Sequence, residues 1–92
     1  MEDAVQILQS AMFKRAYKRL LANQKADVDD AVADIVRNPT IGEAKKGDLA
    51  GVFVHKFKSN GQLRLLAYEY DPGTRLLLLL GSHEDFYRDL TR

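Results

Sequence analysis

The sequence predicts an α+β domain, a small antiparallel sheet with an N-terminal helical hairpin and a short C-terminal helix. Two consecutive segments between residues 11 and 36 repeat apolar residues at helical spacing. Three strand-like runs follow, separated by Ser59-Asn60-Gly61 and by Asp71-Pro72-Gly73-Thr74, which are typical of hairpin turns. The expected element order is β-α-α-β-β-β-α. Because 92 residues with 46% hydrophobic content can bury one modest core, we expect a single domain over residues 1–92.

The N-terminal third is expected to hold one strand and two helices. Residues 4–9 form a short apolar run that fits a strand or a first helical turn, and we expect the strand. Residues 11–22 are predicted to form an amphipathic helix with Ser10 as its N-cap. A second helix, joined through residues 22–24, carries the same pattern from Val28 to Val36 and must end near Asn38-Pro39.

The remaining chain is expected to form a loop and three strands. Pro39 and the glycines at 42, 47 and 51 indicate an irregular loop over residues 38–51. Strands are predicted over residues 52–58, 62–70 and 75–80. For the first hairpin we expect a three-residue loop with Gly61 in the left-handed conformation, because a two-residue turn would mix polar and apolar side chains on both faces.

This register makes a specific prediction about the sheet surface. It pairs Lys56 with Arg64 and Lys58 with Gln62, so Lys56, Lys58 and Arg64 would form one cationic patch. The other face would be apolar, and its expected members are Phe53, Phe57, Leu63, Leu65 and Ala67. His55 would lie on that apolar face as a packed or capping histidine.

Composition excludes several classes of protein. The chain has no cysteine, and its two histidines stand far apart, so we expect neither a disulfide framework nor a metal site, and no cofactor. The longest apolar run, residues 76–80, is too short to span a bilayer, and no signal-peptide pattern opens the chain. We therefore expect a cytoplasmic protein without a membrane partner.

Charge is segregated along the chain although the formal net charge is only +1. Residues 14–25 contain no acidic residue and five basic ones, among them Lys14, Lys18 and Arg19. Residues 27–34, in contrast, contain four aspartates and no basic residue. A second basic group comprises Lys45, Lys46, Lys56, Lys58 and Arg64. Such patches are typical of surfaces that bind nucleic acid or an acidic protein, and a plain solvated face is the alternative for each.

The C-terminal stretch GSHEDFYRDLTR raises the question of a catalytic site. Ser82 can cap a last helix that begins at His83, and His83, Phe86, Tyr87 and Leu90 then share one helical stripe. That stripe is either the edge of the core or the titratable part of an active site. If it opens onto the cationic patch, His83, Tyr87, Lys56 and Arg64 converge and could cleave RNA without a metal. Attack by the 2′-hydroxyl requires a base, an acid and fixed cations near the phosphate.

Five short motifs also suggest a family: Asn38-Pro39-x-Ile41-Gly42-Glu43, Lys46-Gly47-Asp48-Leu49-Ala50-Gly51, His55-Lys56-Phe57-Lys58, Leu65-Leu66-Ala67-Tyr68-Glu69 and Gly81-Ser82-His83-Glu84-x-Phe86-Tyr87-Arg88-Asp89-Leu90. With them, nearly the whole chain resembles the RelE/ParE superfamily of type II toxin-antitoxin toxins, in its ParE-like toxin branch. The resemblance implies a bacterial protein that a cognate antitoxin neutralises. We expect Lys14, Lys18 and Arg19 to contribute to antitoxin binding.

The superfamily contains two activities. RelE-like members are ribosome-dependent mRNA endonucleases, whereas ParE-like members poison DNA gyrase and lack the catalytic set. Because Lys56, Arg64, His83 and Tyr87 fall where the endonuclease residues would lie, we expect mRNA cleavage on the ribosome, with Lys45, Lys46 and Lys58 as further nucleic-acid contacts. The alternatives are a gyrase poison without catalytic activity of its own and a non-toxic protein-binding module.

Overall fold

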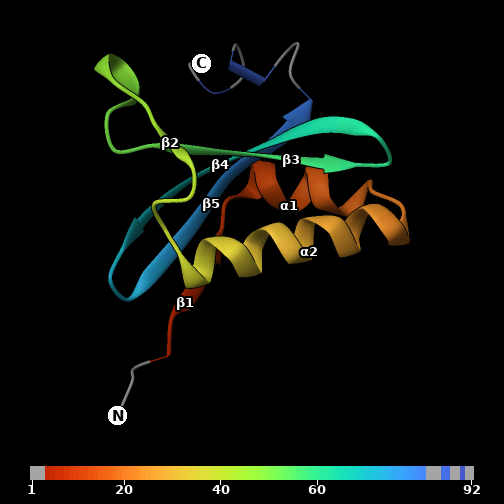
Figure 1. Cartoon of the computed structure of the whole chain (residues 1–92), viewed down its shortest axis with the longest axis horizontal. Coiled ribbons are helices and arrows are strands. Elements are labelled where there is room, and N and C mark those ends of the chain that lie inside the picture. The colour runs from red at the N-terminus through yellow and green to blue at the C-terminus, as the bar shows by residue number, and fades with distance from the viewer. Residues whose placement is uncertain (1–3, 83–85, 88–89, 91–92) are drawn as a thin grey trace.

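A five-stranded sheet with the order β1-β5-β4-β3-β2 organises the chain (Figure 1). The structure is a computed structural model and describes residues 4–82, 86, 87 and 90. The strands are β1 (Gln6–Gln9), β2 (Glu43–Ala44), β3 (Phe53–Ser59), β4 (Gln62–Asp71) and β5 (Thr74–Ser82). Edge strand β1 runs parallel to β5, and every other pairing is antiparallel. The predicted α+β class is confirmed, as are the leading strand and the three long strands.

Two helices, α1 (Ala11–Lys18) and α2 (Ala22–Arg37), lie together on one side of the sheet (Figure 1). Ser10 caps α1 as predicted, because its hydroxyl accepts a hydrogen bond from the Phe13 amide at 3.0 Å. The predicted boundary between the helices is wrong: α1 ends at Lys18, and residues 22–24 form the first turn of α2. The Gln24 side chain accepts a hydrogen bond from the Leu21 amide at 2.9 Å, which satisfies a backbone donor at the start of α2.

The predicted register of the β3–β4 hairpin is also wrong. Ser59 pairs with Gln62 across a two-residue turn in which Asn60 and Gly61 have φ angles of 55° and 75°. Positive φ at both central residues is the geometry of a type I′ turn, which Asn-Gly favours. Consequently Arg64 lies opposite Phe57, and Lys56 lies opposite Leu65.

This register separates the residues that were expected to form one cationic patch. Directly opposed residues share a face, so Arg64 lies with Phe57 on the side of the helices, whereas Lys56 and Lys58 lie on the other side. Phe53 and Phe57 likewise lie on the helix side, away from Leu63, Leu65 and Ala67. The expectation failed because it assumed a single buried face, and this sheet is covered on both.

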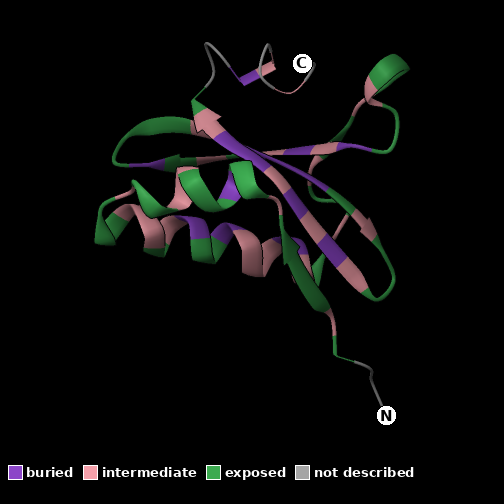
Figure 2. Ribbon diagram, turned by 180° about the vertical axis from the view of Figure 1, so that it is seen from behind, coloured by how far each residue is buried: buried purple, intermediate pink, exposed green. Residues whose placement is uncertain are grey.

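Each face of the sheet has its own hydrophobic core. On the helix side the buried cluster comprises Phe13, Val28, Ile35, Leu66, Tyr68, Leu77 and Leu80. On the opposite side it comprises Val52, Val54, Leu65, Ala67, Leu79 and Phe86, with Leu49, Leu78, Tyr87 and Leu90 packed against it. Figure 2 shows the resulting alternation of buried and partly buried residues along β5. His55 is half-buried on the helix side and stacks on Phe57 at 6.0 Å, as expected of a packed histidine.

Two further segments complete the fold. The predicted loop over residues 38–51 contains strand β2 and a 3₁₀ turn, η1 (Gly47–Leu49), which carries Leu49 onto the core opposite the helices. Ser82 is the last residue of β5, and Phe86, Tyr87 and Leu90 have helical backbone, but the predicted helix start at His83 lies outside the described residues. No helix in the described part of the chain is long and apolar enough to cross a bilayer.

Candidate functional site

A cluster of charged groups and one phenol occupies the sheet face opposite the helices. We call Glu43, Lys45, Lys56 and Tyr87 the sheet-face cluster. Strand β2 pairs Glu43 with Val54, which places the carboxylate on the same face as Val54 and Lys56. The Lys45 ammonium lies 2.5 Å from a Glu43 carboxylate oxygen and 4.9 Å from the centre of the Tyr87 ring. The cluster therefore joins the β2 loop, strand β3 and the C-terminal segment.

The electrostatics of the cluster keep its acid and its base ionised. The hydrogen bond from Lys45 and the attraction of Lys45 lower the pKa of Glu43, and the more distant charge of Lys56 adds to this effect. The same hydrogen bond with Glu43 raises the pKa of Lys45, and a hydrogen bond with Tyr87 raises it further. Glu43 is thus a carboxylate at neutral pH, and Lys45 is an ammonium group between a carboxylate and a phenol.

The structure brings together only part of the predicted catalytic set. Lys56 and Tyr87 lie on the same face of the sheet, whereas Arg64 lies on the helix side. The Nε atom of Arg64 is buried and has no hydrogen-bond partner within the described part of the chain. The prediction that Arg64 joins Lys56 at one site is therefore wrong, because the two-residue turn shifts the register by one. The position of His83 lies outside the described residues.

The other predicted nucleic-acid contacts border the sheet-face cluster. Lys58 is exposed and points to the same face as Lys56, two residues further along β3. Lys46 is exposed at the start of η1, directly after Lys45. Both lysines extend the positive charge of this face and remain predictions as nucleic-acid contacts.

Glu43 is a functional candidate that the sequence analysis did not single out. The predicted set of His83, Tyr87, Lys56 and Arg64 contains no carboxylate, whereas Glu43 supplies one to the sheet-face cluster. A signal was present in the sequence, because Glu43 and Lys45 are two residues apart and residues so spaced on a strand share a face. The signal was hidden because β2 has only two residues and lies within a glycine-rich loop.

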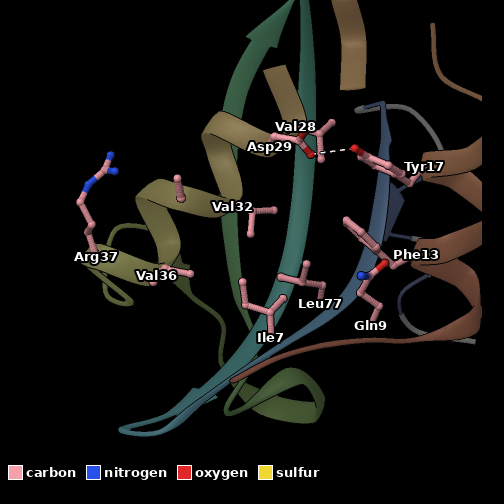
Figure 3. A pocket seen from close by; sticks show the side chains of 11 residues that line it. Ile7, Gln9, Phe13, Tyr17, Val28, Asp29, Val32, Val36, Arg37 and Leu77 are labelled. Atoms are coloured by element: carbon pink, nitrogen blue, oxygen red, sulfur yellow. Dashed lines mark hydrogen bonds between the residues drawn. The ribbon is translucent and has the colours of Figure 1, made fainter. Parts of the chain in front are cut away.

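A second surface lies on the helix side. An apolar groove of about 620 Å³ runs between the helices and β1, and its lining includes Ile7, Phe13, Val32, Val36 and Leu77 (Figure 3). The Tyr17 hydroxyl donates a hydrogen bond of 2.7 Å to Asp29, which links α1 to α2 at one end of the groove (Figure 3). This hydrogen bond raises the pKa of the Tyr17 phenol.

The predicted antitoxin-binding bases lie beside this groove. Lys14, Lys18 and Arg19 are exposed on α1 and at its C-terminal cap. Lys14 and Lys18 line a shallow depression that shares Gln9 and Tyr17 with the groove. The apolar groove and the basic helix surface are therefore continuous.

As for metals, the described residues include no group of three or more acidic or histidine side chains that could hold an ion.

Solved structures of toxins and of toxin-antitoxin complexes share this fold. The RelBE2 toxin-antitoxin complex from Mycobacterium tuberculosis contains a chain with 21% identity and a TM-score of 0.72, covering 87% of this chain and 99% of that one. The intact RelBE complex from E. coli gives 14% identity and a TM-score of 0.71, with coverage of 88% and 99%. The YoeB/ParE toxin from Agrobacterium tumefaciens gives 17% identity and a TM-score of 0.70, with coverage of 86% and 99%. At these identities the likeness establishes the fold alone.

Sequence comparison identifies the family directly. No curated protein matches the chain at a significant level. A family model described as the ParE-like toxin of type II bacterial toxin-antitoxin systems, however, matches residues 7–91. That match extends from β1 to the C-terminal segment, and so includes both surfaces described above. The chain therefore belongs to the ParE-like toxin family of type II bacterial toxin-antitoxin systems.

Proposed function

We propose that this toxin is a metal-independent, ribosome-dependent mRNA endonuclease whose sheet-face cluster contacts the RNA. The observation that carries the proposal is the contact of Lys45 with both Glu43 and Tyr87, on the face of the sheet that also carries the exposed Lys56. Cleavage by the 2′-hydroxyl needs a base, an acid and cations near the phosphate. Glu43 provides a carboxylate base, Tyr87 a phenol that orients or donates a proton, and Lys45 and Lys56 the cations. His83, the predicted general base or acid, lies outside the described residues and remains a prediction.

The proposal is tested by following transcripts after induction. The wild-type toxin should cut mRNA at codon positions only while the transcript is being translated. Tyr87→Phe, which keeps the ring and removes the hydroxyl, should lower cleavage by about 10²-fold or more, as should Lys56→Ala. Lys14→Ala is the matched control because it removes a cation from the other side of the sheet. Intact mRNA after wild-type induction would refute the proposal.

A second candidate is a gyrase poison, and the position of Arg64 is the observation that favours it. Among the described residues no guanidinium joins the sheet-face cluster to bind phosphate, since Arg64 lies on the helix side. If the protein acts on gyrase, induction should produce gyrase-linked double-strand breaks and a DNA-damage response without transcript cleavage. Under the endonuclease proposal, Arg64→Ala should retain cleavage while Lys56→Ala loses it. Equal loss in both variants would contradict the separation of these two residues.

The cognate antitoxin is the partner we propose for the groove and the basic surface of α1. The groove is apolar, and the adjacent bases Lys14, Lys18 and Arg19 are exposed, so an acidic amphipathic segment complements both parts. Reversing the charge of these three residues to Glu should accelerate dissociation and weaken its dependence on salt. Lys58→Glu on the opposite face should leave binding unchanged. If the triple variant binds as the wild type does, α1 lies outside the interface.

A further inference from the structure

The hydroxyl group of a buried tyrosine connects the middle of the sheet to the loop that carries Glu43. Tyr68 is fully buried on the helix side of β4, opposite Phe53 of β3, and its ring stacks on Phe53 at 5.7 Å. Its hydroxyl donates a hydrogen bond of 2.6 Å to the Pro39 carbonyl and accepts one of 3.0 Å from the Gly42 amide. One hydroxyl therefore holds two backbone groups of the segment between α2 and β2.

The backbone at Gly42 lies so close to this phenol that no side chain fits there. A Cβ atom at Gly42 would lie 2.8 Å from the Tyr68 hydroxyl oxygen and 3.0 Å from the carbonyl carbon of Val54. The backbone must shift to accept such an atom, because one of the two neighbours is itself backbone. Gly42 is thus required by the close approach of the chain to Tyr68 and β3.

Strand β2 needs this support because it is so short. It consists of Glu43 and Ala44, paired with Val54 and Phe53, and one further hydrogen bond of 2.9 Å joins the Lys45 amide to the Val52 carbonyl. Glu43 follows Gly42 directly, so any movement of Gly42 moves the carboxylate. With so few ladder bonds, the anchor at Tyr68 supplies a large share of the hydrogen bonds that hold this segment.

We infer that Tyr68 is a positioning residue that holds Glu43 and Lys45 in register with Lys56 and Tyr87 across the sheet. Its side chain lies on the helix side of the sheet, so it acts on the sheet-face cluster only through the backbone at Gly42. The consequence for cleavage rests on the proposed endonuclease function, whereas the consequence for the geometry of Glu43 does not. A misplacement of about 1 Å far from the reacting atoms can cost about 10²-fold in rate.

The test is Tyr68→Phe, which keeps the ring and removes both hydrogen bonds. Amide exchange at Lys45 should become about tenfold faster, the equivalent of one net hydrogen bond. The pKa of the Glu43 carboxyl, followed by NMR titration, should rise toward its usual value as the contact with Lys45 loosens, and transcript cleavage should fall by about 10²-fold. Gly42→Ala should reproduce these effects through the opposite side of the same contact. Tyr70→Phe is the control, because the Tyr70 hydroxyl makes no hydrogen bond to any residue in the described part of the chain.

The outcomes separate the two proposals. Unchanged titration of Glu43 and unchanged exchange at Lys45 in Tyr68→Phe would overturn the inference. A uniform acceleration of exchange throughout the protein would also overturn it, since Tyr68 would then support only overall stability. If the local changes appear in Tyr68→Phe but the wild-type protein cleaves no transcript in any assay, the positioning role stands and the endonuclease proposal fails.

Discussion

Replacing Glu43 with glutamine should strengthen RNA binding while it weakens cleavage, and these opposite signs test the sheet-face cluster directly. The substitution keeps the shape of the side chain but removes its charge. The Lys45 ammonium lies 2.5 Å from a Glu43 carboxylate oxygen, so under the endonuclease proposal the carboxylate competes with RNA phosphate for this cation. In Glu43→Gln that ammonium is released, and the general base is lost.

The structure sets the size of each effect. Lys45 gains one phosphate contact, so the dependence of log affinity on log salt concentration for a single-stranded RNA should steepen by about 0.7. Loss of a general base lowers the rate of cleavage by about 10²–10⁴-fold. Stability should change little, because the side chains of Lys45 and Glu43 are 21% and 63% exposed and surface ion pairs contribute little to folding.

Two assays measure these quantities on the antitoxin-free toxin. Fluorescence anisotropy with a short RNA over a range of salt concentrations gives the affinity and its slope, and primer extension on a translated message gives the cleavage rate. Lys58→Gln serves as the control for binding, since it should flatten the slope where Glu43→Gln steepens it. Full cleavage by Glu43→Gln would refute the role of Glu43 as base. A weaker affinity for RNA in that variant would refute the competition between carboxylate and phosphate.

Two further predictions concern stability. Arg75 is buried and donates hydrogen bonds to the carbonyls of Ile35, Val36, Asp71 and Thr74. Arg75→Met should therefore lower the free energy of unfolding, measured by urea titration, by about 2–4 kcal/mol. A loss below about 1 kcal/mol would contradict this account. Burial lowers the pKa of His55 in the folded protein below 6.5, its ordinary value. As the pH falls, the histidine of the unfolded chain therefore takes up its proton first. The stability of the folded protein should fall as the pH drops through 6.5 toward the lower pKa of the folded state. His55→Gln should lack this component, and equal pH dependence in the two proteins would show that the histidine is not desolvated.

The local pattern of the sequence was sufficient to predict the fold class, the two helices and the four longer strands. Ser10 caps α1 as expected, since capping depends on groups within one turn. The leading strand and the three long strands also appear where apolar runs and turn residues place them. The boundary between the helices was misjudged because the expected linker begins α2, with Gln24 bonded to the Leu21 amide. The position at which a helix begins depends on which backbone N–H groups still lack a hydrogen-bond partner. The spacing of apolar residues carries no information about this.

The sequence by itself determined which residues are cationic, that two hairpins join the last three strands, and that the chain resembles a toxin family. Only the tertiary structure decided which of these residues share a surface. A shift of one residue in the β3–β4 register moves every side chain of a strand to the other face, and the Asn60-Gly61 turn sets that register. Arg64 therefore lies on the helix side, while Glu43, distant in sequence from Tyr87, joins the cluster through Lys45. These placements depend on two buried faces and a two-residue strand, and both arise from packing between segments far apart in the chain.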